Sequence, residues 1–80
     1  MEIKSRSNNG VTKIMHNGIK IYVNPLLQDG SEWVVRSAGN RQLTENEAKE
    51  AFELAEGKTP KYINKKFVNK TSPHDFKICL

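Results

Sequence analysis

One stretch of the chain decides the fold: residues 32–57, which read EWVVRSAGNRQLTENEAKEAFELAEG. Its first five residues, with Trp-Val-Val at their centre, predict a strand, and the Ser-Ala-Gly-Asn that follows has the composition of a turn. Thr44 and Glu47 have the spacing of a capping box, which starts an α-helix. Gly57 ends this helix and Pro60 prevents its continuation. We therefore expect a strand, a turn and a helix in this order.

The predicted helix carries a single apolar stripe at the spacing i, i+3, i+4, i+7. The stripe consists of Ala48, Ala51, Phe52 and Ala55. Because three of its members are alanines, the helix can approach a sheet closely, and Phe52 must supply most of the contact volume. We expect this phenylalanine to pack against Ile21, Trp33 or Val35. Leu54 lies about 120° from the stripe, where it either extends the edge of the core or contacts a partner.

Residues 11–23 predict a β-hairpin around Asn17-Gly18, since a type I′ turn needs positive φ at both central positions. A two-residue turn there pairs His16 with Ile19 and sets the register of both strands. Alternation then divides the side chains between two faces. The inner face carries Ile14, Ile19, Ile21 and Val23. The outer face carries Val11, Lys13, Met15, Lys20 and Tyr22.

The remaining segments are polar or short. Residues 1–10 are rich in polar and turn-forming residues and predict a flexible N-terminal arm. Leu26 and Leu27 lie in a loop, either tucked under the sheet edge or exposed as an anchor. Thr59-Pro60 either caps a second short helix or begins an extended segment. Apolar residues alternate with polar ones over residues 76–80, which predicts a final strand.

Together these elements predict a single α+β domain spanning residues 1–80. We expect a small two-layer fold in which an antiparallel sheet of three to four strands carries one α-helix packed on one face. No apolar run exceeds three residues, so we expect neither a transmembrane segment nor a signal peptide. The one cysteine, Cys79, favours a reduced thiol in a cytoplasmic protein, with an intermolecular bridge as the alternative.

The net charge of +4 is unevenly distributed along the chain. Residues 1–43 carry six basic and three acidic residues, giving +3, and residues 57–80 carry six lysines and one aspartate, giving +5. Residues 44–56 carry one lysine and five glutamates, giving −4. If the protein binds a polyanion, its helix is therefore not the binding element. The alternative is that the glutamates form an ordinary solvated helix face.

Catalytic and metal-binding motifs are missing from the sequence. There is no nucleophile-elbow motif and no glycine-rich phosphate loop. His74 precedes Asp75, but adjacent side chains of an extended chain point in opposite directions. His74 and Cys79 supply two possible zinc ligands where a site needs three or four. We expect no enzyme, no cofactor and no metal, with a catalytic role of His74 and Asp75, or of His16, as the alternative.

Basic side chains interleaved with aromatic ones offer a binding surface. On a sheet, cations can contact phosphates while an aromatic ring stacks on a base. The candidate binding residues are Lys13, Lys20, Tyr22, Arg36, Arg41, Lys65 and Lys66. The other interpretation is that lysine and tyrosine simply cover the solvated side of an open antiparallel sheet.

Residues 19–57 resemble the arm-type DNA-binding domains of phage integrases, which are small three-stranded sheets followed by a helix and contact DNA through the sheet. The resemblance rests on Trp33-Val34-Val35, Gly39-Asn40-Arg41 and Thr44-x-x-Glu47-Ala48, and it covers about half of the chain. In size, fold class and lack of catalytic motifs, the chain is also similar to small phage-encoded accessory proteins, including anti-CRISPR proteins. That likeness implies inhibition by covering a surface.

Two functions follow as expectations. The first is a non-catalytic binding protein that inhibits or modulates a nucleic-acid-handling complex by surface occlusion, with a protein or nucleoprotein complex as its partner. The second is a module that binds DNA or RNA directly through the basic outer face of the sheet. Neither involves a membrane.

Overall fold

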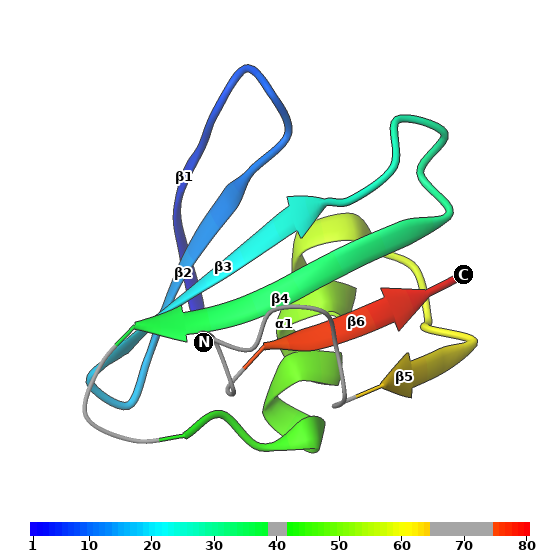
Figure 1. The fold of residues 1–80 in the computed structure, drawn as a ribbon. Coiled ribbons are helices and arrows are strands. Elements are labelled where there is room, and N and C mark those ends of the chain that lie inside the picture. Colours follow the sequence, from blue (N-terminus) through cyan, green and yellow to red (C-terminus); the bar gives the residue numbers. More distant parts are fainter. Residues whose placement is uncertain (39–41, 65–74) are drawn as a thin grey trace.

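The computed structural model describes residues 1–38, 42–64 and 75–80. Within these ranges the chain forms six strands and one α-helix (Figure 1). The elements are β1 (Glu2–Arg6), β2 (Thr12–His16), β3 (Ile19–Pro25), β4 (Glu32–Ala38), α1 (Glu45–Glu56), β5 (Tyr62–Asn64) and β6 (Phe76–Cys79).

The strands form one sheet in the order β1-β2-β3-β4-β6-β5, and every neighbouring pair is antiparallel. Strand β6 lies between β4 and β5, so β1 and β5 are the edges. In Figure 1, β4 and β6 cross in front of α1, which packs on the far side of the sheet as drawn. The α+β class is therefore confirmed. The expectation of three to four strands is wrong, because the described residues contain six.

The hairpin of β2 and β3 has the predicted turn and register. Asn17 and Gly18 have φ angles of 47° and 83°, the positive values that a type I′ turn requires. Across the strands His16 pairs with Ile19, and the pairing continues in step to Thr12 and Val23. The inner face of the hairpin therefore faces α1 as expected.

The N-terminal residues form an edge strand where the sequence predicted a flexible arm. Ile3 of β1 pairs with Ile14 of β2, and the register shifts between Ile3 and Ser5, as at a β-bulge. Ile3 packs partly buried against the core. The Arg6 guanidinium reaches α1 and donates a hydrogen bond of 2.8 Å to the backbone oxygen of Ala55. Because the last turn of α1 has no basic residue of its own, Arg6 supplies the cation that favours a helix C-terminus.

The segment after the helix is extended rather than helical. Strand β5 pairs with β6 through Ile63 and Ile78, and the Lys61 amide donates to the Cys79 carbonyl at 2.8 Å. The final strand is present as predicted. Of the two alternatives for Thr59-Pro60, a cap of a second short helix or the start of an extended segment, the structure shows the extended segment.

Both termini of α1 are formed by the residues that the sequence predicts. The Thr44 hydroxyl accepts a hydrogen bond of 3.2 Å from the Glu47 amide, and the Glu47 carboxylate accepts one of 3.1 Å from the Thr44 amide. Gly57 has a φ of 70°, and its amide donates to the Glu53 carbonyl at 2.8 Å. The capping box and the glycine cap together fix both ends of α1.

The core lies between α1 and the inner face of the sheet. Its centre is an edge-on contact of Trp33 with Phe52, whose ring centroids are 5.7 Å apart at an interplanar angle of 64°. The prediction that Phe52 packs on the sheet is confirmed. Leu54 is 44% exposed, so it lies outside the core. Leu26 and Leu27 are 41% and 43% exposed, which corrects the expectation that they are tucked under the sheet edge.

Candidate functional site

The surface of the sheet opposite α1, here called the outer face, collects the described residues that the sequence proposed for binding. Lys13 of β2, Tyr22 of β3 and Arg36 of β4 are consecutive cross-strand partners. Lys20 lies two residues before Tyr22 on β3 and therefore shares its face. Since neighbouring strands lie about 4.8 Å apart, the row from Lys13 to Arg36 spans about 10 Å. We call Lys13, Lys20, Tyr22 and Arg36 the basic patch.

The sequence named three further binding residues. Arg41, Lys65 and Lys66 lie outside the described residues. The structure therefore unites four of the seven candidates on one face and does not place the others.

The two lysines of the patch have no acidic partner among the residues that the structure describes. Lys20 is exposed between its cross-strand partners Met15 and Ala38, and Lys13 is half-buried beside Tyr22. Within residues 1–38, 42–64 and 75–80, no carboxylate lies within ion-pair distance of Lys13 or Lys20. These ammonium groups can therefore attract an anion from outside the molecule.

Lys77 of β6 also lies on the outer face, but unlike the patch lysines it has an acidic partner. Its ammonium group lies 2.8 Å from the Glu32 carboxylate. The hydrogen bond that the Lys77 ammonium donates to the Glu32 carboxylate raises the pKa of Lys77 above its ordinary value. This pair is neutral as a unit, so among the described residues the lysines without an acidic partner on the outer face are those of the basic patch.

Arg36 stands at the border of the patch beside a buried acid. The Arg36 guanidinium is 3.6 Å from the Asp75 carboxylate, and the two side chains are 44% and 6% exposed. Strand β6 creates this contact, because Phe76 pairs with Val35 and so places Asp75 opposite Arg36. Sequence reasoning did not connect Asp75 with the patch. The aspartate weakens the positive potential at Arg36 without removing the exposed guanidinium.

The row of side chains next to the patch is more buried than an open sheet surface would be. Val34 is on the outer face, yet it is only 5% exposed between its cross-strand partners Asn24 and Lys77. The Asn24 side-chain oxygen is buried and has no hydrogen-bond partner among the described residues. An unpaired buried carbonyl typically costs about 1–3 kcal/mol, so this position is not optimised for stability.

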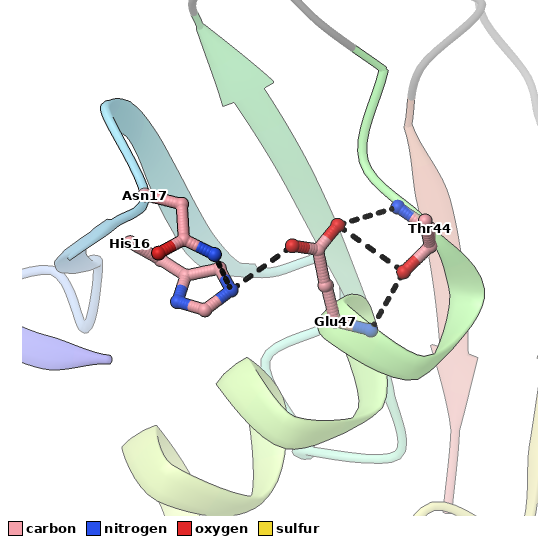
Figure 2. A network of polar contacts seen from close by, with 4 residues as sticks. All are labelled: His16, Asn17, Thr44 and Glu47. Carbon is pink, nitrogen blue, oxygen red and sulfur yellow. Dashed lines mark hydrogen bonds and ion pairs between the residues drawn. The ribbon is translucent and has the colours of Figure 1, made fainter.

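A second polar cluster joins the hairpin turn to the start of the helix (Figure 2). His16 points at Glu47, with Nε2 2.9 Å from Oε2, and the two side chains are 18% and 15% exposed. Oε1 of Glu47 accepts from the amide and the hydroxyl of Thr44 at 3.1 Å each. Asn17 Nδ2 lies 3.3 Å from His16 Nε2. The cluster therefore connects two elements of the fold, and the pairing of His16 with Ile19 places His16 on the helix side of the hairpin.

In the described parts of the chain, no three His, Cys, Asp or Glu side chains come together in a way that could hold a metal ion. Asp75 is described, whereas His74, the other member of the proposed catalytic pair, lies outside the described residues.

A shallow hollow of about 420 Å³ lies between the β1–β2 loop and the β3–β4 loop. In Figure 1 both loops project from the same end of the sheet. The lining residues are Asn8, Asn9, Gly10, Pro25, Leu26, Leu27 and Gln28. They include no titratable group, so the hollow offers an uncharged, partly apolar surface and no acid–base chemistry.

Comparison of the chain with protein-family models, with curated proteins and with solved structures finds no match. No helix in the described part of the chain has the length and apolar character needed to cross a membrane. The candidate site is therefore described from the structure alone, without the guidance of a related protein.

Proposed function

We propose that this is a non-catalytic binding protein that inhibits or modulates a nucleic-acid-handling complex by covering one of its surfaces, as phage anti-defence proteins such as anti-CRISPR proteins do. The observation that carries the proposal is the basic patch: an aromatic ring and three cations, two of which have no acidic partner among the described residues, on the sheet face opposite α1. Such a face suits the phosphates of a nucleoprotein complex or an acidic surface of its protein.

The opposite side of the molecule supports this proposal. Helix α1 carries five glutamates and one lysine, and it packs on the other face of the sheet. The two faces therefore have opposite charge. Such polarity orients a small protein as it approaches a charged partner and discourages docking by the wrong side.

The proposal is tested by affinity purification of the tagged protein from host-cell lysate. Three forms are compared: the parent, Lys20→Glu/Arg36→Glu in the patch, and Lys49→Glu/Lys58→Glu as a control with the same change in net charge. We expect the parent and the control to retain a stoichiometric protein or nucleoprotein partner and the patch variant to lose it. Absence of any stoichiometric partner, or equal retention by all three forms, contradicts the proposal.

A second candidate function is direct binding of DNA or RNA by the same patch. The order Lys13, Tyr22, Arg36 across three strands favours it, because an aromatic ring between two cations can contact both a base and its phosphates. Affinity should fall steeply with salt, in proportion to the number of phosphates contacted. Mobility-shift assays at two salt concentrations test this, and no shift at low salt with either DNA or RNA rejects it.

A further inference from the structure

We infer that the basic patch takes a single-stranded rather than a double-stranded nucleic acid, with one base stacked on the ring of Tyr22 and the adjoining phosphates held by Lys13, Lys20 and Arg36. This inference rests on the second candidate function above. Its basis is the position of the tyrosine in the sheet and the placement of the cations around it.

The width of the sheet argues against reading a duplex. Tyr22 lies on β3, with two strands on one side and three on the other. Six strands at about 4.8 Å spacing are about 24 Å across, whereas the major groove of B-DNA is about 12 Å wide. A flat face of this width does not fit into the major groove of undistorted B-DNA, so a side chain in its middle would not reach base edges there. An undistorted duplex would therefore present its phosphates to this patch, and the aromatic ring would stack on no base.

A single strand removes this obstacle, because its bases are free to turn toward the protein. Tyr22 is half-buried, so part of its side chain remains open to solvent on the outer face. Its cross-strand partners are both cationic, which places a positive charge on either side of the ring. Lys20 adds a third, two residues along the same strand. Single-strand-binding surfaces combine these two features, a stacking ring and cations along the backbone path.

The number of cations also sets the expected salt dependence. Contacts to three phosphates of a single strand give a slope of about −2 in a plot of log affinity against log salt, at about 0.7 per phosphate. Because Asp75 lies 3.6 Å from Arg36, the Arg36→Ala variant should lower this slope less than Lys20→Ala does.

The test is filter binding at low salt with three oligonucleotides of one length: a single strand, the same strand annealed to its complement, and a single strand with abasic sites in its central half. We expect the ordinary single strand to bind about five-fold or more tightly than the other two, since stacking of one base typically contributes about 1–3 kcal/mol. Tyr22→Ala should lower single-strand affinity by a similar factor, and Tyr22→Phe should retain it.

Tyr62→Ala is the matched control. Tyr62 is an exposed tyrosine of the same sheet but lies on the edge strand β5, outside the patch. The Tyr62→Ala variant should bind the single strand as the parent does. If Tyr62→Ala loses affinity and Tyr22→Ala does not, the assignment of Tyr22 as the stacking ring is overturned. Should Tyr22→Ala fail to fold, the abasic comparison on the parent protein decides.

The possible failures are distinguishable. Equal affinity for the single strand, the duplex and the abasic strand overturns the single-strand inference while leaving direct nucleic-acid binding intact. No binding to any of the three at low salt overturns both, and it leaves the surface-occlusion proposal to the affinity purification.

Discussion

Phe52 is the residue on which the packing of helix against sheet depends. It is fully buried, its helix neighbours in the core are alanines, and its ring meets Trp33 edge-on. Truncation to alanine leaves a cavity that the small neighbours cannot fill. We expect Phe52→Ala to lower the free energy of unfolding by about 3–5 kcal/mol, which is comparable to the whole stability of a small domain. A thermal melt should show it largely unfolded at 37 °C.

Leu54→Ala is the control, because Leu54 lies on the same helix but is 44% exposed. It should melt within a few degrees of the parent. A Phe52→Ala variant that does the same would mean that the helix does not depend on this contact.

At the scale of elements, the start of α1 depends on the capping box of Thr44 and Glu47. Thr44→Ala removes the hydroxyl that accepts from the Glu47 amide, so one helix N–H loses its partner. We expect a loss of about 0.5–2 kcal/mol in the free energy of unfolding, measured by urea denaturation. Asn46→Ala, an exposed change in the same turn, should have a smaller effect. Equal midpoints for the two variants would contradict a capping role.

The loop between β3 and β4 gives the molecule a predictable response to acid. Hydrogen bonds from the hydroxyl and amide of Ser31 hold the pKa of the Asp29 carboxyl below its usual range. A depressed folded-state pKa contributes stability above the ordinary value of about 3.9, and this stability is lost as the pH falls through the folded pKa. Melting temperature between pH 6 and 2 should therefore depend less on pH in Asp29→Asn than in the parent. Identical profiles would show that these hydrogen bonds do not stabilise the fold.

At the scale of the whole molecule, β1 protects the edge of the sheet and contacts the end of α1. Deleting residues 1–6 would expose β2 as an unpaired edge and remove the bond from Arg6 to Ala55. We expect a lower melting temperature and concentration-dependent self-association in size-exclusion chromatography. Lys4→Ala, which removes only an exposed ion pair with Glu2, should remain monomeric if the parent is. A deletion variant that behaves like the parent would show that β1 does not protect the edge of the sheet.

The parts of this fold that sequence predicts are those fixed by local chemistry. Asn17-Gly18 sets the hairpin register, and with it the shared face of Lys13, Lys20 and Tyr22. Strand β1 was missed because its bulge breaks the alternation and because Ile3 is its one apolar side chain. Strand β5 was left open because three residues are too few to show a period.

The remainder of the site depends on pairings between distant segments. Arg36 completes the row because β4 pairs with β3 across the loop that begins at Leu26. Asp75 reaches Arg36 because β6 enters the sheet between β4 and β5. No local signal carries that order, since it results from how the chain as a whole buries its apolar faces.

The burial of Trp33 on the helix side has a practical consequence. It is the one tryptophan of the chain, 8% exposed, and its indole N–H donates to the Gly30 carbonyl at 3.0 Å. Its fluorescence therefore reports on the docking of α1 and shifts to longer wavelength when the core opens to water. The basic patch lies on the other side of the sheet, so a ligand bound there leaves the indole environment unchanged. Intrinsic emission can thus certify that each patch variant is folded in the same sample in which its binding is measured.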